Sequence, residues 1–123
     1  MKYRVAIASF DGTYVDQHFG HARKYYIYDF DSETNTYEFI EKRFVETKCA
    51  CASHDENAFA NVFETLSDVS AIIISRIGLG ASDIVENKGY VIYESTYPVE
   101  DVLKGIANGR LYEVDKWQKI TKN

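Results

Sequence analysis

The stretch Asp16-Gln17-His18-Phe19-Gly20-His21-Ala22 places two histidines around a Phe-Gly turn, between two segments that read as strands. It is polar, interrupted by glycine, and too short to form a buried element. Loops held between strands are where binding groups gather. Further along, the chain carries a second cluster of potential metal ligands, Cys49-Ala50-Cys51-Ala52-Ser53-His54. We expect the two stretches to face one pocket; the alternative is that each is an ordinary loop.

The segments on either side of the first stretch predict strands. Residues 3–9 carry apolar side chains on one face and small ones on the other, and residues 24–30 are rich in aromatic and β-branched residues. Residues 36–43 alternate aromatic with charged side chains, as a half-exposed strand does. The polar turn at residues 31–35 therefore predicts an antiparallel hairpin between the last two strands.

A first helix is predicted directly after the cysteines. Ser53 and Glu56 form a capping box. An apolar stripe follows at Ala58, Phe59, Val62, Phe63 and Leu66. Residues 71–75 are continuously apolar, as expected of a strand covered on both faces.

The last third of the chain continues the alternation. A glycine-punctuated turn at residues 76–81 leads into a second, short helix, and residues 90–93 predict another strand. Pro98 and Gly109 bracket a last helix. Residues from about 110 to 123 are expected to form a polar tail.

The resulting order is strand-strand-strand-helix-strand-helix-strand-helix. A hairpin followed by alternating strands and helices predicts an α/β fold, with a mixed sheet and helices on the faces of that sheet. The chain has 123 residues, an ordinary globular composition and no internal repeat or linker, so residues 1–123 are expected to form a single domain.

Composition narrows the function classes. The net charge of -5 and the scattered basic residues argue against nucleic-acid binding, which depends on clustered Lys and Arg. The sequence shows neither an apolar run near the ~20 residues of a membrane span nor a signal peptide, so a cytoplasmic location is expected. In that compartment, two cysteines one residue apart are more often reduced, and metal-binding or redox-active, than bridged.

Three groups of side chains could ligate a metal. Imidazole is the commonest side-chain ligand, which makes His18 and His21 candidates. In an extended segment Cys49 and Cys51 would point the same way, so both thiols could approach one soft metal or cluster. His54 would lie in the first turn of a helix, where the dipole keeps the imidazole neutral and able to ligate. The alternative is a pair of small thiols and exposed histidines with no ligand.

The turn Gly78-Leu79-Gly80 is a candidate for anion binding. Glycine lets the backbone approach a ligand closely, and N–H groups at the start of the following helix can bind an anion. The turn lacks the third glycine of a dinucleotide fingerprint and the lysine of a Walker loop. It is expected to form a third wall of a pocket for an anionic cluster.

A two-metal nuclease is the competing interpretation of the four aspartates Asp11, Asp16, Asp29 and Asp31. Two of them lie in natural turn sequences and no basic surface is present for a nucleic acid, so a hydrolase is disfavoured. No serine or cysteine nucleophile stands in a recognisable catalytic context, and no catalytic residue is expected.

Four features of the sequence together resemble the dinitrogenase iron-molybdenum cofactor biosynthesis family. They are an N-terminal strand that ends in a Ser-x-Asp-Gly turn, the His-Phe-Gly stretch at residues 15–22, a Tyr-Tyr-Ile-Tyr strand and the Gly-Leu-Gly turn. That family includes the NifX and NafY carriers and the C-terminal domain of NifB. The resemblance extends to about Gly109, and the length of the chain fits a stand-alone member.

The resemblance implies a ribonuclease H-like fold and the binding of an iron-sulfur or iron-molybdenum type cluster, or its precursor, as cofactor cargo. The partners implied are cluster donor and acceptor proteins, with no nucleic acid and no membrane. By position, His18 matches the histidine of the family motif, and the cysteine segment lies where members often carry Cys or His. The cofactor-binding residues implied are His18, Phe19, Gly20, His21, Gly78, Leu79 and Gly80, and the metal ligands are His18, Cys49, Cys51 and His54.

We therefore expect a non-enzymatic carrier of a metallocluster. Two other functions stay open on the sequence alone. One is a small thiol redox or metal-dependent enzyme that uses the Cys-x-Cys pair. The other is a metal-free interaction module in which the histidines and cysteines are incidental.

Overall fold

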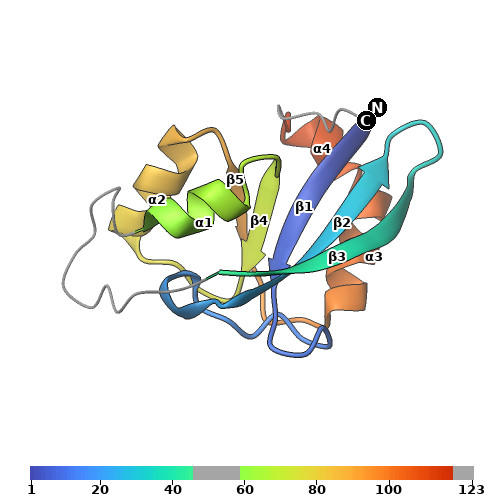
Figure 1. Cartoon of the computed structure of the whole chain (residues 1–123). Coiled ribbons are helices and arrows are strands. Elements are labelled where there is room, and N and C mark those ends of the chain that lie inside the picture. The colour runs from blue at the N-terminus through green and yellow to red at the C-terminus, as the bar shows by residue number, and fades with distance from the viewer. Residues whose placement is uncertain (46–58, 118–123) are drawn as a thin grey trace.

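The structure, a computed structural model, describes residues 1–45 and 59–117. In this part of the chain, five strands form one mixed sheet in the order β3-β2-β1-β4-β5 (Figure 1). The strands are β1 (Lys2–Ala8), β2 (Lys24–Asp31), β3 (Thr36–Phe44), β4 (Ala71–Ile74) and β5 (Val91–Glu94). The helices are the 3-10 turn η1 (Phe19–His21), α1 (Ala60–Thr65), α2 (Leu79–Asn87), α3 (Val99–Gly109) and α4 (Leu111–Val114).

The predicted hairpin is present. β2 pairs with β3 in antiparallel register, and β1 pairs with β2 in the same sense. β1, β4 and β5 run parallel, so that Val5 lies beside Ala71, and Ala71 beside Val91. The carboxyl ends of these three strands therefore meet at one edge of the sheet.

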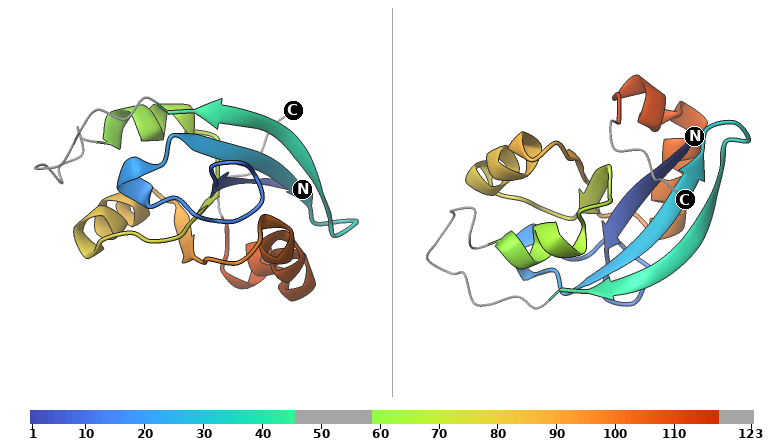
Figure 2. Two further views of the ribbon diagram at one scale, coloured as in Figure 1. Left: turned by 90° about the horizontal axis from the view of Figure 1, so that it is seen from below. Right: turned by 45° about the horizontal axis from the view of Figure 1, so that its top comes forward.

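Two apolar layers cover the two faces of the sheet, as the period of its strands requires. On β1, Ala6 and Ala8 point to one face, toward α1 and α2, whereas Val5 and Ile7 point to the other, toward α3 and α4. Figure 2 shows the two helix pairs on opposite sides of the strands. The small side chains of β1 leave room for the bulky residues of the α1/α2 layer, among them Phe19, Tyr25, Phe59 and Leu66.

The structure differs from the expected polar tail at residues 110–117. α4 forms there, and Tyr112 and Trp117 are 1% and 4% exposed in the layer beneath α3. α3 ends at Arg110, whose left-handed backbone (φ 47°) turns the chain back onto the sheet. The expected cap at Ser53 and Glu56 lies outside the described residues, and the described part of that helix begins at Ala60.

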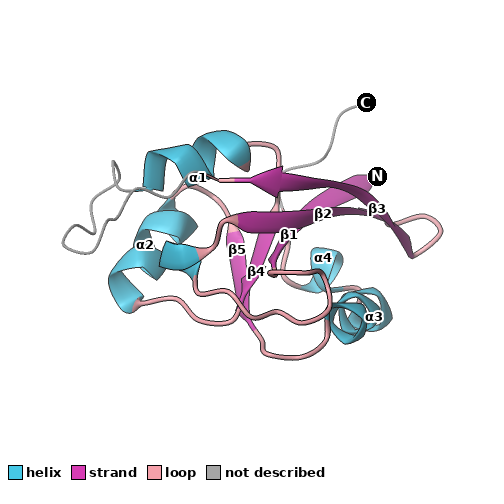
Figure 3. Cartoon of the chain, turned by 60° about the horizontal axis from the view of Figure 1, so that its bottom comes forward, coloured by secondary structure: helices cyan, strands magenta, loops and turns pink. Residues whose placement is uncertain are grey.

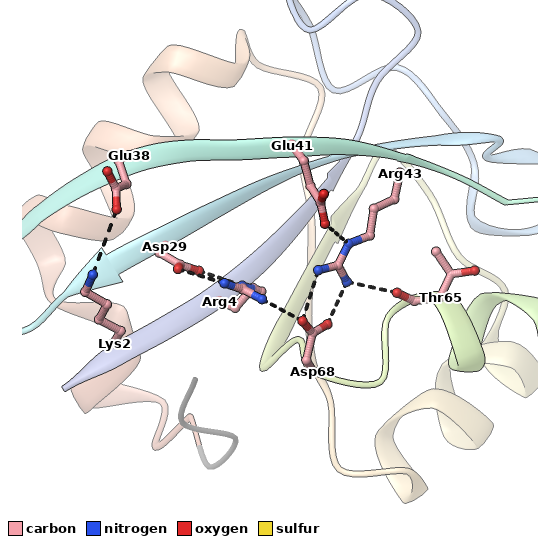
Figure 4. A network of polar contacts seen from close by, with 8 residues as sticks. All are labelled: Lys2, Arg4, Asp29, Glu38, Glu41, Arg43, Thr65 and Asp68. Atoms are coloured by element: carbon pink, nitrogen blue, oxygen red, sulfur yellow. Dashed lines mark hydrogen bonds and ion pairs between the residues drawn. The ribbon is translucent and has the colours of Figure 1, made fainter. Parts of the chain in front are cut away.

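An ion-pair network fastens the hairpin to the turn that follows α1 (Figure 4). Arg4 donates to both carboxylate oxygens of Asp29, at 2.8 and 3.0 Å, and to Asp68 at 2.6 Å. Arg43 donates to Asp68 at 2.6 and 3.0 Å and to the carbonyl oxygen of Thr65 at 2.9 Å. Asp68 is thus the shared acceptor of β1 and β3, and the Arg43 guanidinium, with that of Arg4, lowers the pKa of its carboxyl to about 2.

We expect Asp68→Asn to lower the melting temperature most above about pH 5. A carboxyl whose pKa is lowered by folding stabilises the protein above its unfolded pKa, and this contribution is lost as the pH falls toward the folded value. Since Asp68 is 40% exposed, solvent screening limits the contribution to about 1 kcal/mol. Thermal unfolding followed by circular dichroism between about pH 2 and 7 measures the difference.

The matched control is Glu64→Gln, which removes an exposed carboxylate from α1. The gap between wild type and Asp68→Asn should close on acidification, while the control shows little gap at any pH. A gap that stays constant across the pH range would show that the ionised carboxylate is not what stabilises this corner of the sheet.

Candidate functional site

Three connections meet at the carboxyl edge of the parallel strands (Figure 3). The loop after β1 runs beside the connection from β4 to α2, because the Ser75 amide donates to the carbonyl of Gln17 at 3.0 Å. The same loop meets the connection from β5 to α3, where the Val15 amide donates to the carbonyl of Tyr97 at 3.1 Å. Backbone hydrogen bonds thus hold the histidine stretch against two other segments.

Phe19 anchors the histidine stretch. Its side chain is 1% exposed, and its ring centroid lies 5.1 Å from that of Phe59 in the α1/α2 layer. Its amide donates to the carbonyl of Arg76 at 2.9 Å. The stretch predicted as a loop contains the 3-10 turn η1, closed by a 3.0 Å hydrogen bond from the His21 amide to the carbonyl of His18. Both histidines flank a buried anchor and are themselves exposed.

A cavity of about 440 Å³ lies between this turn and the start of α2. It brings together all seven residues that the family resemblance assigned to cofactor binding, from two segments almost 60 residues apart. Four further lining residues were not predicted. The described residues that line it are His18, Phe19, Gly20, His21, Phe59, Arg76, Ile77, Gly78, Leu79, Gly80 and Ala81.

The start of α2 presents backbone donors to this cavity. Gly78 is the N-cap residue and has no capping side chain, and the first turn contains no acidic residue. The amides of residues 78–81 donate to no acceptor within the described residues, as is usual for an uncapped first turn. The amide of Ile77, just before them, is bound by the Glu94 carboxylate at 2.9 Å, which fixes the turn to β5. The cavity wall therefore combines the positive end of the α2 dipole with the exposed imidazoles of His18 and His21.

The glycines of the two segments are not required by packing. A Cβ added at Gly20, Gly78 or Gly80 would meet no other atom within 4 Å, and none of the three has a positive φ. The space in front of them is open, so glycine leaves the backbone amides accessible from the cavity. The binding role that the sequence predicts for the Gly-Leu-Gly turn stays a prediction.

The remaining predicted ligands, Cys49, Cys51 and His54, lie outside the described residues. Phe59, the first described residue that follows them, lines the cavity. Within residues 1–45 and 59–117, no group of three or more His, Cys, Asp or Glu side chains could hold a metal ion. His18 and His21 alone do not form a metal site, and a metal held here needs ligands from elsewhere or from the metal species itself.

The four aspartates that suggested a two-metal nuclease have separate structural partners. Asp11 and Asp31 accept hydrogen bonds from the amides of Thr13 and Glu33, two residues further on, as turn aspartates do. The other two serve different parts of the fold: Asp16 accepts from the amide of Phe10, and Asp29 pairs with Arg4.

A second cavity, of about 580 Å³, lies on the other side of His18 and Arg76. His18 and Arg76 line both cavities and form an isolated parallel β-bridge with each other. The other residues of the second cavity are Tyr14, Val15, Asp16, Ser75 and Thr96. Sequence reasoning did not single out Arg76, although it lies two residues after the end of β4 and two residues before Gly78.

None of the helices that the structure describes combines the length with the apolar character that crossing a bilayer requires.

Comparison with known proteins identifies related sequences. Residues 1–109 match the family described as "Dinitrogenase iron-molybdenum cofactor". The chain is 34% identical over 106 residues to the FeMo cofactor biosynthesis protein NifB of Klebsiella pneumoniae, covering 80% of this chain and 22% of that protein. It is 33% identical over 88 residues to NifB of Frankia alni, covering 69% of this chain and 17% of that protein. The chain therefore spans about a fifth of the length of these relatives.

Solved structures share the fold. The crystal structure of PH0822 superposes with a TM-score of 0.61 at 22% identity, covering 86% of this chain and 91% of the other. The crystal structure of MJ0327 from Methanocaldococcus jannaschii superposes with a TM-score of 0.52 at 19% identity, covering 100% of this chain and 99% of the other. At these identities the likeness concerns the fold alone.

Proposed function

Because the chain belongs to the dinitrogenase iron-molybdenum cofactor family, we propose that it serves in the assembly of such a cofactor by binding and carrying an iron-sulfur or iron-molybdenum type cluster, or a precursor of one. In this proposal the protein is a carrier and catalyses no reaction on its cargo. Its sheet would be of the ribonuclease H-like kind, an assignment supported by the strand order β3-β2-β1-β4-β5.

The observation that carries the proposal is the cavity between η1 and α2. Two exposed histidines and the first turn of α2 line it together; the amides of that turn have no acceptor among the described residues, and the described lining contains no carboxylate. Metal-sulfur clusters combine metal ions, which imidazole and thiolate bind, with anionic sulfide edges, which N–H groups can bind. The cavity presents both kinds of partner.

His18 is the proposed metal ligand from the described residues, and His21 is the second imidazole beside it. Cys49, Cys51 and His54 stay predicted ligands that would complete the metal coordination. Thiolates and neutral imidazoles ligate only when deprotonated, so cargo loading should weaken as the pH falls. The partners would be the proteins that donate the cluster and accept it, and an exposed cavity at the edge of the sheet suits such a transfer.

Anaerobic reconstitution with iron and sulfide tests the carrier function. We expect wild-type protein to acquire visible cluster absorbance and bound iron, and His18→Ala to retain several-fold less of both, because one metal ligand is lost. The double variant Cys49→Ser/Cys51→Ser tests the ligands proposed from the sequence. The matched control is Asn108→Ala, an exposed residue of α3 on the opposite face of the sheet, which should load as wild type does.

The other outcomes would contradict a part of the proposal or support a different function. Failure of the wild-type protein to bind iron would contradict the iron-sulfur carrier. If His18→Ala bound as much iron as wild type, the cavity between η1 and α2 would not be the binding site. Cysteine-dependent turnover of a thiol substrate, with a disulfide that forms easily, would identify the redox enzyme instead.

A further inference from the structure

We infer that Arg76 is the specificity-determining residue of the cavity between η1 and α2, and that it restricts the cargo to species with a net negative charge. The inference rests on the proposed function, since it describes the ligand class of the same cavity. It adds a role for a side chain that neither the sequence motif nor the comparisons assign.

The described residues that line the cavity differ in charge from the whole protein, although the Glu94 carboxylate binds the amide of one of them, Ile77. The chain carries 19 acidic and 14 basic residues, a net charge of -5. Among the described residues that line this cavity, however, there is no Asp or Glu, and Arg76 is the one side chain with a permanent charge. A local positive site on an acidic surface attracts anions and excludes other acidic surfaces. In a protein with a net negative charge, such a cavity wall therefore selects for anionic ligands.

Within the part of the chain that the structure describes, no carboxylate pairs with the Arg76 guanidinium. It forms no ion pair or side-chain hydrogen bond with any described residue, whereas Arg4, Arg43 and Arg110 all pair with carboxylates. The backbone of Arg76 is nevertheless held in place, because its carbonyl accepts the Phe19 amide at 2.9 Å and the residue forms a β-bridge with His18. The backbone of Arg76 is thus fixed beside that of His18, while the Arg76 side chain remains exposed.

Arg76 and the start of α2 form a complementary donor set. The guanidinium presents several N–H donors in one plane, suited to binding two acceptors of an anion at once. The amides of residues 78–81 add neutral donors along the cavity wall. The second cavity, beyond the His18–Arg76 bridge, has the acidic residue Asp16 in its lining, so an anion is expected on the α2 side of Arg76.

Binding of a defined soft anion tests the inference without reconstituting a cluster. The probe is the tetrathiomolybdate dianion, titrated into metal-free protein and followed by its visible absorbance and by equilibrium dialysis. We expect Arg76→Gln to weaken binding roughly tenfold, the effect of losing one charge-assisted interaction. Wild-type binding should weaken as salt is added, and this dependence should flatten in Arg76→Gln and be largely restored in Arg76→Lys.

Arg23→Gln is the matched control. Arg23 is an exposed arginine on the segment between η1 and β2, but it lines neither cavity. Its removal changes the net charge as much as Arg76→Gln does and should leave affinity almost unchanged. The melting temperatures of all these variants should match wild type, because the structural contact of Arg76 is made by its carbonyl.

The outcomes separate this inference from the proposed function. Arg76-dependent binding of the dianion together with failed cluster reconstitution would support the anion selectivity and reject the iron-sulfur carrier. Successful reconstitution with equal dianion affinity in wild type and Arg76→Gln would overturn the inference and leave the carrier function standing. Equal losses in Arg76→Gln and Arg23→Gln, or no dianion binding by wild type, would also overturn it.

Discussion

Phe19→Ala is expected to destabilise the fold by about 3 kcal/mol, and to abolish cargo binding even in the molecules that remain folded. Phe19 is 1% exposed, and its removal leaves a void beside Phe59, 5.1 Å away between ring centroids. Urea unfolding monitored by circular dichroism gives the loss of stability. Dianion or cluster binding, measured below the start of unfolding, gives the functional loss.

The functional loss follows from where Phe19 lies in the chain. It is the buried residue of η1, with His18 before it and Gly20 and His21 after it. Without its ring, η1 has no buried side chain of its own, so the two imidazoles lose their fixed position relative to α2. Preorganised ligands bind more tightly because less ordering remains to be done on binding.

Two variants make the Phe19 result interpretable. Phe19→Leu keeps most of the buried volume and should retain most of both stability and binding. Phe39→Ala removes a phenylalanine that is 50% exposed on the edge strand β3, and should cost far less stability and no binding. If Phe19→Ala bound its ligand as wild type does, the position of the histidines would not depend on this anchor.

The sheet could be predicted because the pattern of residues within each strand is itself typical of a strand. The hairpin was indicated by alternating aromatic and charged residues, and the central strand at residues 71–74 by an unbroken apolar run. The register shift between Ile27 and Tyr28 could not be predicted, because a bulge leaves no composition signal in so aromatic a strand.

The sequence predicts those residues of the candidate site that belong to a recognisable pattern, and not those that only the fold brings to the cavity. His18 and the Gly78–Gly80 turn have recognisable sequence patterns, and their meeting follows from a common edge of parallel strands. Arg76 has no pattern of its own. Its proposed role depends on the described lining of the cavity between η1 and α2, which contains no Asp or Glu, and that lining comes from segments distant in sequence.

The segment after α3 was missed for a related reason. α4 has four residues, too few to show a helical period, and Tyr112 and Trp117 lie among charged neighbours. Their burial depends on the aromatic face of β1 and β2. A hydrophobic pattern read along the chain cannot show that face.

Trp117→Ala is expected to cost about 3–5 kcal/mol, a large share of the 5–15 kcal/mol that stabilises a typical domain. The Trp117 side chain is 4% exposed. Its ring centroid lies 6.2 Å from those of Tyr3, Phe30, Tyr93 and Tyr112. Its Nε1–H donates to the Tyr93 hydroxyl at 3.0 Å. Because Trp117 is the sole tryptophan, unfolding must be followed by circular dichroism rather than by fluorescence.

Control variants separate packing from hydrogen bonding at this position. Trp117→Phe removes the N–H and part of the ring and should cost clearly less than alanine, whereas Val114→Ala, at a side chain 65% exposed on α4, should cost almost nothing. The family match ends at residue 109, before α4. Full stability in Trp117→Ala would mean that residues 110–117 do not belong to the folded core.

The Trp117 and Phe19 variants should also differ in function, because their side chains lie on opposite faces of the sheet. Trp117 packs under α3 and α4, and none of the described aromatic residues around its ring lines the cavity. Below its melting temperature, Trp117→Ala should therefore bind the dianion with wild-type affinity, despite a loss of stability at least as large as that of Phe19→Ala. Equal losses of affinity in both variants would show that binding follows global stability, and that the proposed anchor has no local role.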